Sequence, residues 1–476
     1  MDSKLPKNWE IVNVSEFVSL LEIGGRPRGG AGKLTEGIPS ISAEHFNYGG
    51  GFKFEKLKFI TEEFYEKLNK GKIKNGDVLV VKDGATTGKS AYIDNKFPFD
   101  KAAVNEHTFI IRTYEGFENK LLFYFTLSSD FNNYILNTIG GSTIGGIKKG
   151  FINELRFNLP PLAEQQRIVA KLDTLFGSLD ALKIRLNNIP QLIKNFKQAV
   201  LTQAVTGKLT QEWRVGKELE YASLLNKNNQ VEFEIINFDF LPNNWLKTAL
   251  GNYANCSRGK FSVRPRNDPR YFDGNYPFMQ IGDLPREGGY TSDYSKTLNE
   301  EGIKVSKSFP KGTVVVAIVG ATIGLTGILE KEMFFPDSLI GLNCENFISN
   351  QYLEYYLRLC KNGFREISYA GGGQPNIKLP TIKNLELLIP PLKEQTEIVK
   401  RVENLFSKAD AIEKQYKTLK EKIDRLPQAI LAKAFKGELV AQLPTDGDAK
   451  DLLEEIKKLK ESLVVKPKKK VVRNKK

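Results

Sequence analysis

The feature that most constrains this chain of 476 residues is an internal repeat covering most of its length. The stretch "LPKNWEI" at Leu5 returns as "LPNNWLK" at Leu241, and "GDVLVVKDGATTGKSAYI" at Gly76 aligns without gaps on "GTVVVAIVGATIGLTGIL" at Gly312. Three further pairs follow in the same order: "RPR" at Arg26 and Arg264, "LPPLAEQQRIVAKLDTLF" at Leu159 with "IPPLKEQTEIVKRVENLF" at Ile389, and "QAVLTQAVTGKL" at Gln198 with "QAILAKAFKGEL" at Gln428. This ordered agreement indicates that a unit of about 200 residues occurs twice, which predicts a pseudo-twofold tandem molecule.

Each repeat has two parts of different character. The first part, about 150 residues, is rich in glycine, aromatic residues and short β-branched runs such as "DVLVV" and "TVVVAIV", which is typical of a mixed α and β domain. The second part is helical, because apolar residues recur at alternating steps of four and three. The first series runs Leu172, Leu175, Leu179, Leu182, Leu186, Ile189, Ile193, Phe196, Val200, and the second runs Val402, Leu405, Ala409, Ile412, Tyr416, Leu419, Ile423, Leu426, Ile430. This period of 3.5 predicts the seam of a left-handed coiled coil.

Two such seams in one chain can pair with each other. We therefore expect an α+β fold in which two globular mixed α/β domains are held apart by two long helices that form an antiparallel coiled coil. The "PPL" triplets fit helix starts, and Gly207 and Gly437 fit helix ends. Pro190 and Pro427 fall inside the pattern, so each is expected to kink its helix.

These patterns divide the chain into six expected segments. They are a first globular domain at 1–155, a first coiled-coil helix at 156–210, a linker at 211–240, a second globular domain at 241–385, a second coiled-coil helix at 386–440, and a C-terminal helix with a basic tail at 441–476.

Charge and composition narrow the class of protein. The net charge is +14, and the tail from Lys466 to Lys476 carries seven Lys or Arg and no acid, so half of the excess lies there. This balance permits a polyanionic partner without requiring one. Three widely spaced cysteines offer neither a disulfide framework nor a CxxC metal site. With no apolar leader and no run near the roughly 18 apolar residues of a membrane span, we expect a cytoplasmic protein with no membrane partner.

The stretch "GATTGKS", from Gly84 to Ser90, resembles a nucleotide-binding loop at first sight. A Walker A loop needs four residues between its first glycine and its Gly-Lys, whereas three separate Gly84 from Gly88. The second copy, "GATIGLT", replaces Lys89 with Leu325 and keeps both glycines. The shared pattern predicts a glycine turn between two strands. The alternatives are a turn whose Thr and Lys touch a phosphate backbone and, least favoured, an NTPase site.

Other catalytic patterns are absent from the sequence. The two histidines, His45 and His107, have no metal-ligand spacing and no counterpart in the other repeat. "NLPPL" and "IPPL" lack the residues of an adenine methyltransferase NPPY box. We expect no catalytic, cofactor-binding or metal-binding residues in this chain, and interpret it as a binding protein.

The two helix starts, "PPLAEQQRIVAKLDTLF" and "PPLKEQTEIVKRVENLF", resemble the conserved regions of type I restriction-modification specificity subunits, the HsdS family. The "GDVLVVKDGATTGKSA" stretch and both helix ends resemble the same family, and the likeness covers about residues 5–440. It implies that each globular domain is a target recognition domain that reads one half of an asymmetric bipartite site in double-stranded DNA. It also implies that the helices set the spacing and dock two modification (methyltransferase) subunits.

The resemblance further implies restriction subunits as partners. Those subunits and the methyltransferases would carry ATP, Mg and S-adenosylmethionine, with none of these cofactors in this chain. Two other interpretations stay open: the specificity chain of a type IIB-like system, and a coiled-coil scaffold with no role on DNA.

Base readout needs bidentate donors such as Arg, Asn and Gln, and phosphate positioning needs Lys, Arg and loop hydroxyls. The candidate DNA-binding residues are therefore those of the paired RPR loops, of the loops after "IPSIS" and "YPFMQ", and of the glycine turns. They are Arg26, Arg28, His45, Lys82, Thr86, Thr87, Lys89, Arg264, Arg266, Gln280 and Thr322. The glycine-rich "GGSTIGGIKK" and "GGGQPNIK" stretches are candidates through their backbone amides, and the tail lysines through their charge.

Overall fold

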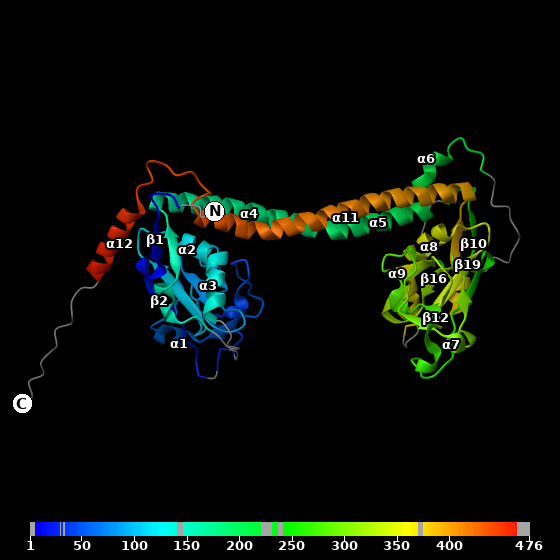
Figure 1. Cartoon of the computed structure of the whole chain (residues 1–476), viewed down its shortest axis with the longest axis horizontal. Coiled ribbons are helices and arrows are strands. Elements are labelled where there is room, and N and C mark those ends of the chain that lie inside the picture. The colour runs from blue at the N-terminus through cyan, green and yellow to red at the C-terminus, as the bar shows by residue number, and fades with distance from the viewer. Residues whose placement is uncertain are drawn as a thin grey trace, which may run out of the picture. The chain divides into compact units, whose positions relative to one another are not determined.

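A computed structural model describes residues 5–28, 30–31, 34–139, 146–219, 231–236, 241–369 and 375–463. The chain forms two compact units, and each is assembled from more than one stretch of sequence. Unit 1 contains residues 1–186 and 418–476, whereas unit 2 contains residues 187–417. Both units mix helices with strands (Figure 1), which confirms the mixed α and β content expected from the sequence.

Unit 1 begins with a strand-rich part and ends in helices. Its strands are β1 (Glu10–Asn13), β2 (Val18–Ile23), β3 (Ile38–Ile41), β4 (Lys58–Ile60), β5 (Val78–Val81), β6 (Ser90–Tyr92), β7 (Ala103–Val104), β8 (Thr108–Thr113) and β9 (Arg156–Leu159). Its helices are α1 (Glu62–Lys67), α2 (Asn119–Thr126), α3 (Ser129–Ile139), α4 (Leu162–Asn187), the last part of α11 (Leu392–Phe435), and α12 (Ala449–Leu463).

Unit 2 repeats this plan. Its strands are β10 (Leu246–Ala249), β11 (Ala254–Arg258), β12 (Phe272–Phe278), β13 (Tyr290–Thr291), β14 (Lys296–Leu298), β15 (Ser308–Phe309), β16 (Val314–Ala317), β17 (Thr326–Leu329), β18 (Met333–Phe334), β19 (Leu339–Cys344) and β20 (Glu386–Ile389). Its helices are α5 (Ile189–Val205), α6 (Gln211–Arg214), α7 (Glu300–Lys304), α8 (Asn350–Leu359), α9 (Lys361–Tyr369), α10 (Leu379–Lys383) and the first part of α11.

The sheets of the two units have matching topology. The order β2-β8-β5-β6 in unit 1 corresponds to β11-β19-β16-β17 in unit 2, where β13 adds one more strand. In a second sheet, β3 pairs antiparallel with β4 and parallel with β7, as β12 pairs with β14 and β18. The antiparallel pairs β1·β9 and β10·β20 also correspond. The sequence repeat is therefore a repeat of structure.

The central strand of each main sheet is buried on both faces. In β5, Val78 and Val80 join a core with helices α2 and α4, while Leu79 and Val81 point into a second core with the aromatic residues of the β3 layer. In unit 2, β16 alternates between its two cores in the same way. Because successive side chains of a strand face opposite sides, a strand covered on both faces must be continuously apolar. This explains the runs "VLVV" and "VVVA".

The "PPLxEQ" helix start is anchored by the same contacts in each unit. Trp9 Nε1 donates to Glu164 Oε2 at 2.9 Å, and Trp245 Nε1 donates to Glu394 Oε2 at 3.0 Å. Both carboxylates are fully buried. The glutamine that follows each of them accepts a backbone N–H from the start of α2 or α8 and donates to a proline carbonyl of its own motif. The motif therefore fixes a long helix to its sheet domain.

Each core also contains the end of a helix from the other repeat. In unit 1, Leu431 and Phe435 of α11 share a hydrophobic cluster with Leu172 of α4. In unit 2, Val200 and Leu201 of α5 share a cluster with α8 and the start of α11. Helix α11 therefore begins in unit 2 and ends in unit 1, whereas the first repeat contributes α4 to unit 1 and α5 to unit 2.

The two prolines inside the expected coiled coil have different consequences. Pro190 lies at the start of α5, so the first repeat has two helices, α4 and α5, where one kinked helix was expected. Pro427 lies inside α11, which runs through it as one helix of 44 residues. Proline is accommodated readily only in the first turn of a helix, which explains why a new helix begins next to Pro190.

Candidate nucleic-acid interface

The loops that carry most of the candidate residues meet at one edge of each main sheet. In unit 1, Ile23 at the end of β2 pairs with Phe109, and Val81 at the end of β5 pairs with Thr108. Three connections therefore lie at this same edge of the sheet: the loop after β2, the turn after β5 and the segment before β8. The corresponding edge of unit 2 lies at Arg258, Ala317 and Leu339. We call these two places the loop edges.

The "GATTG" stretch is a tight turn of a β-hairpin, as the sequence predicts. β5 and β6 are antiparallel neighbours, the Gly88 N–H donates to the Val81 carbonyl at 2.9 Å, and the Thr87 hydroxyl donates to the Gly84 carbonyl at 2.7 Å. Gly84 and Gly88 have φ values of 91° and 88°, which other residues rarely adopt. The second copy forms the same hairpin between β16 and β17. The positive φ values explain why the turn requires glycine at both positions. The Gly88 amide is already used within the hairpin, so it is not available to bind a nucleotide phosphate.

Lys89, the lysine that suggested a nucleotide site, lies on the aromatic ring of Tyr48. Its Nζ is 3.6 Å from the ring centroid, and Tyr48 is 83% exposed. Lys82, before the turn, forms an ion pair with Asp83 at 3.1 Å. Thr86 is partly exposed at the tip of the turn. In unit 2 the hydroxyl of Thr322 donates to the Val319 carbonyl at 3.0 Å.

Charged contacts connect the RPR loop of unit 1 to the glycine turn. Arg26 Nε lies 3.1 Å from Glu106 Oε1, and Glu106 lies 3.4 Å from His107 Nε2. His107 Nδ1 is 2.5 Å from Asp83 Oδ1, the residue before the turn. Arg28 is exposed. The structure therefore brings Arg26 and Lys82 into one network at the loop edge.

The RPR loop of unit 2 is fixed in a related way. Arg266 Nη2 contacts both carboxylate oxygens of Asp337, at 2.8 and 3.0 Å. Asp337 precedes β19 as Glu106 precedes β8, so an arginine of each RPR loop pairs with an acid at the same place in the fold. Arg264 donates instead to the Val263 carbonyl at 2.8 Å. Both loops are held at the loop edge while their arginines stay largely exposed to solvent.

His45, one of the candidate DNA-binding residues, is buried. It is 1% exposed, its Nδ1 accepts the Ser42 N–H at 3.0 Å, and its Nε2 lies 3.1 Å from the Lys56 carbonyl oxygen. Both ring nitrogens are therefore occupied within unit 1, and the ring cannot read a base without leaving its site. Asp283 closes the matching turn of unit 2, where the Gln280 N–H donates to its carboxylate at 2.6 Å. Gln280 itself is half-buried.

The glycine-rich stretches meet the glycine turns at their described ends. Asp83 forms a β-bridge with Gly146, and Val319 forms one with Asn376. The remaining parts of these stretches, 140–145 and 370–374, and the tail lysines at 466–476 lie outside the described residues.

Sequence reasoning missed two cations beside the glycine turn of unit 2. Arg365 Nη2 donates to the Ala321 carbonyl at 2.9 Å, and Lys361 packs against Gly324, where an added Cβ would lie 2.8 Å from the Lys361 Cα. Both side chains come from α9, and Arg365 lies 44 residues after Ala321, so local sequence could not connect them with the turn. The signal that was available is the contrast between "KNGFREISY" and the corresponding "SDFNNYILNTI" of α3, which has no lysine or arginine.

The described part of the chain lacks two structural features that would indicate other functions. No helix among the described residues is long and apolar enough to cross a membrane. Within the same described ranges, no three His, Cys, Asp or Glu side chains are grouped so that they could hold a metal ion.

Comparison with known proteins identifies the class. The family described as "Type I restriction modification DNA specificity domain" matches twice, at residues 6–191 and 242–421, once in each repeat. The chain therefore belongs to the family of type I restriction-modification specificity subunits, which confirms the resemblance stated from the helix starts. Members of this family are the non-catalytic recognition chains of their systems.

Individual relatives agree over almost the full chain. It is 30% identical to the EcoKI specificity subunit of Escherichia coli K12, covering 95% of this chain and 96% of that one. It is 22% identical to the MjaIX specificity subunit of Methanocaldococcus jannaschii, covering 92% and 94%. The solved HsdS subunit from Thermoanaerobacter tengcongensis is similar in fold, with a TM-score of 0.58 and 20% identity over 92% of this chain and 99% of that one.

Proposed function

We propose that each unit of this chain reads one half of an asymmetric, bipartite site in double-stranded DNA. The observation that carries the proposal is the repeated loop edge: the same sheet, the same glycine turn and an acid-anchored RPR loop occur once in each unit. Exposed arginines on a fixed loop have the bidentate donors that guanine edges and phosphates accept. Because the residues around the two edges differ, the two half-sites differ as well.

The long helices would set the distance between the half-sites. In this proposal, α4 and α5 pair with α11 as an antiparallel coiled coil that separates two target recognition domains. The pairing is supported inside each unit, where helix ends from both repeats share one core. At 1.5 Å per residue, α11 is about 66 Å long, roughly two turns of B-DNA.

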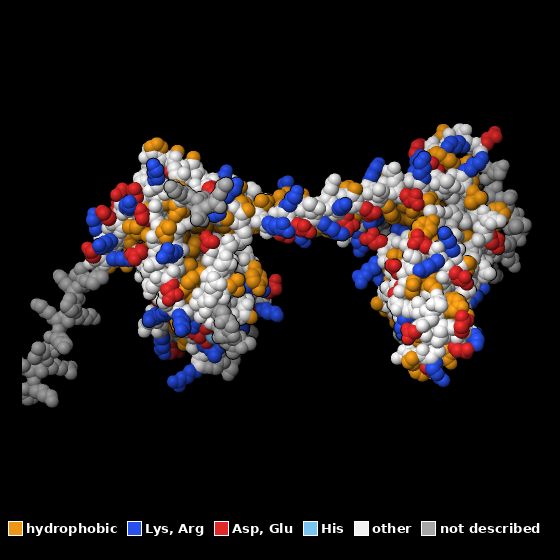
Figure 2. Space-filling view, viewed as in Figure 1, with side chains coloured by type: hydrophobic (Ala, Val, Ile, Leu, Met, Phe, Trp, Pro, Cys, Tyr) orange, Lys and Arg blue, Asp and Glu red, His pale blue; other side chains and the backbone are white. Residues whose placement is uncertain are grey.

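The same helices would dock two methyltransferase subunits. Outside the predicted seam, the long helices leave large apolar side chains exposed in each unit: Ile184 in unit 1, and Leu192 and Leu392 in unit 2. Exposed apolar side chains that are grouped on a surface mark protein interfaces, and the proposal assigns these side chains to such a contact. Charged side chains of both signs lie along the helices in the view of Figure 2, and polar residues of this kind form the rim of protein interfaces.

The chemistry would then belong to other chains. S-adenosylmethionine would be bound by the methyltransferase subunits, and ATP and Mg by restriction subunits, which would complete the complex. The domain boundaries expected from the sequence, with recognition domains at 1–155 and 241–385, are retained as part of this proposal.

The proposal is tested with two variants, one in each unit, which should affect different half-sites. In the complex reconstituted with its modification subunits, R26A/R28A should weaken or relax recognition of one half-site, and R264A/R266A should do so for the other. Each lost bidentate contact costs about 1–3 kcal/mol of discrimination. Binding to a panel of duplexes in which single base pairs of the target are exchanged measures the effect.

The two variants are each other's control. If either variant changed both half-sites equally, or if neither changed the base preference, the assignment of one half-site to each unit would be wrong.

A further inference from the structure

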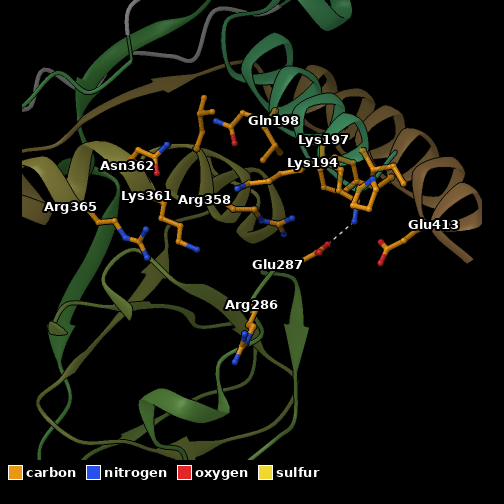
Figure 3. A pocket seen from close by; sticks show the side chains of 15 residues that line it. Lys194, Lys197, Gln198, Arg286, Glu287, Arg358, Lys361, Asn362, Arg365 and Glu413 are labelled. Carbon is orange, nitrogen blue, oxygen red and sulfur yellow. Dashed lines mark hydrogen bonds and ion pairs between the residues drawn. The ribbon is translucent and has the colours of Figure 1, made fainter. Parts of the chain in front are cut away.

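Unit 2 contains a cleft of about 540 Å³ whose wall is rich in cations (Figure 3). It lies between α5, the α8–α9 corner, α11 and the loop that carries Arg286. The charged residues that line it are Lys194, Lys197, Arg286, Arg358, Lys361 and Arg365, against the acids Glu287 and Glu413.

Two of these cations are already neutralised inside unit 2. Lys197 Nζ pairs with Glu287 at 2.6 Å, the dashed contact of Figure 3, and with Asp410 at 2.9 Å. Arg358 makes two hydrogen bonds to Glu354, at 3.0 and 2.6 Å. These two residues therefore stabilise the wall of the cleft and carry no free charge.

Four cations keep uncompensated charge. Among the described residues, Lys194, Arg286, Lys361 and Arg365 have no carboxylate within ion-pair distance. Burial, with Arg365 and Lys194 nearby, lowers the pKa of the Lys361 ammonium. A bound anion would relieve this repulsion, because an opposite charge stabilises the ammonium form.

The cluster adjoins the glycine turn of the same unit. Arg365 holds the Ala321 carbonyl, and Lys361 contacts Gly324. In unit 1 the matching turn carries its own cation, Lys89, where unit 2 has Leu325. Both units thus place positive charge beside this turn, but they take it from different elements: the turn in unit 1 and helix α9 in unit 2.

We propose that Lys361 and Arg365, with Lys194 on the facing helix α5, form a binding site for the phosphodiester backbone of duplex DNA. This inference rests on the proposed function. The backbone is the partner that the observations favour, because it is chemically identical at two half-sites whose bases differ. A cation beside the turn is kept in both units, as a common partner requires, while the neighbouring loops diverge.

The test is the salt dependence of binding by the complex reconstituted with its modification subunits. The probe is a DNA duplex that carries the sequence motif at which methylation is found in cells that have the system. Each phosphate contact contributes roughly 0.9 to the slope of log K against log[salt], so K361Q/R365Q should lower the magnitude of the slope by about 1–2. The base preference should not change, because phosphate contacts carry no sequence information.

Two controls separate charge from folding. K361R/R365K keeps both charges and should retain the wild-type slope. K217Q/K393Q removes two exposed charges that do not line the cleft and should also leave the slope unchanged. Thermal unfolding of each variant reports whether unit 2 remains folded.

The outcomes are distinct. An unchanged slope in K361Q/R365Q, with specific binding intact in the wild type, overturns the phosphate site and leaves the proposed function standing. If the wild-type complex binds no sequence specifically, the proposed function fails. An unchanged slope together with weaker binding of the methyltransferase subunits would assign the cleft to an acidic protein segment instead, and would also overturn the proposal.

Discussion

The two buried glutamates of the helix starts, Glu164 and Glu394, show how the two repeats differ in the contacts that stabilise the same motif. Glu394 accepts from Trp245 and from Thr210, and it forms an ion pair with Arg214, whose side chain is 13% exposed. Glu164 occupies the matching place, and its donors among the described residues are neutral: Trp9 at 2.9 Å and Gln442 at 2.8 Å. The two repeats therefore stabilise the same motif with different charge balance.

This difference predicts unequal effects of one substitution. E394Q leaves the Arg214 guanidinium without its carboxylate, and breaking a buried ion pair in this way costs about 3–5 kcal/mol. E164Q weakens hydrogen bonds from neutral donors and should cost about 1–3 kcal/mol. Hydrogen exchange of the first turns of α11 and α4 measures the two effects separately, since unfolding of two units need not be a single transition. Equal losses of protection would contradict the account.

A second prediction for a single residue concerns Lys89. K89A should lower the slope of log K against log[salt] for DNA by about 0.9, because one phosphate contact is lost, with the target sequence unchanged. The purified chain should bind no ATP, with or without the substitution. Isothermal titration with ATP is the check, and tight binding that K89A abolishes would restore the nucleotide-site interpretation.

The sequence predicted the positions of individual site residues only in part. Loop arginines and the turn lysine are visible as residue types, but the sequence did not show that their loops meet at one edge of the sheet. The burial of His45 could not, because its partners are a backbone amide and a carbonyl that only the folded loop brings to the ring. Lys361 and Arg365 were missed because α9 reaches the glycine turn through the fold, far from it in sequence.

Among the elements, the glycine turns are the clearest success of the sequence. Two copies with a shared pattern of glycines and flanking apolar runs predicted strand, turn and strand, and both hairpins form. The helices were predicted from a period of 3.5, yet the sequence did not reveal that α4 and α5 separate at Asn188 while α11 continues through Pro427.

Two glycines at different positions of the two turns, Gly84 at the start of the first and Gly324 at the end of the second, tolerate a methyl group differently. Gly84 has open space where a Cβ would lie, so G84A should cost only the strain of a positive φ, about 1–2 kcal/mol. At Gly324 a Cβ would lie 2.8 Å from the Lys361 Cα, so G324A adds a clash with backbone and should cost more. Thermal unfolding of the two variants makes the comparison, and a larger loss for G84A would contradict the packing described here.

For the whole molecule, the proposed role of the helices makes a length-dependent prediction. Removing one heptad from each repeat, residues 180–186 and 417–423, shortens each helix by about 10 Å, roughly three base pairs of DNA. The spacer of the recognised site should shorten accordingly, or the complex should fail to assemble. Replacing the same heptads with seam-preserving sequence of equal length is the control, and an assembled complex with an unchanged spacer would refute the ruler.

The central claim is that this chain selects an asymmetric site in two halves, one for each unit. Mapping N6-methyladenine in the DNA of cells that carry the system tests it most directly. We predict one motif with two different specified halves and an unspecified spacer, lost when the gene for this chain is deleted. A continuous palindromic motif, or methylation that is independent of this chain, would contradict the account.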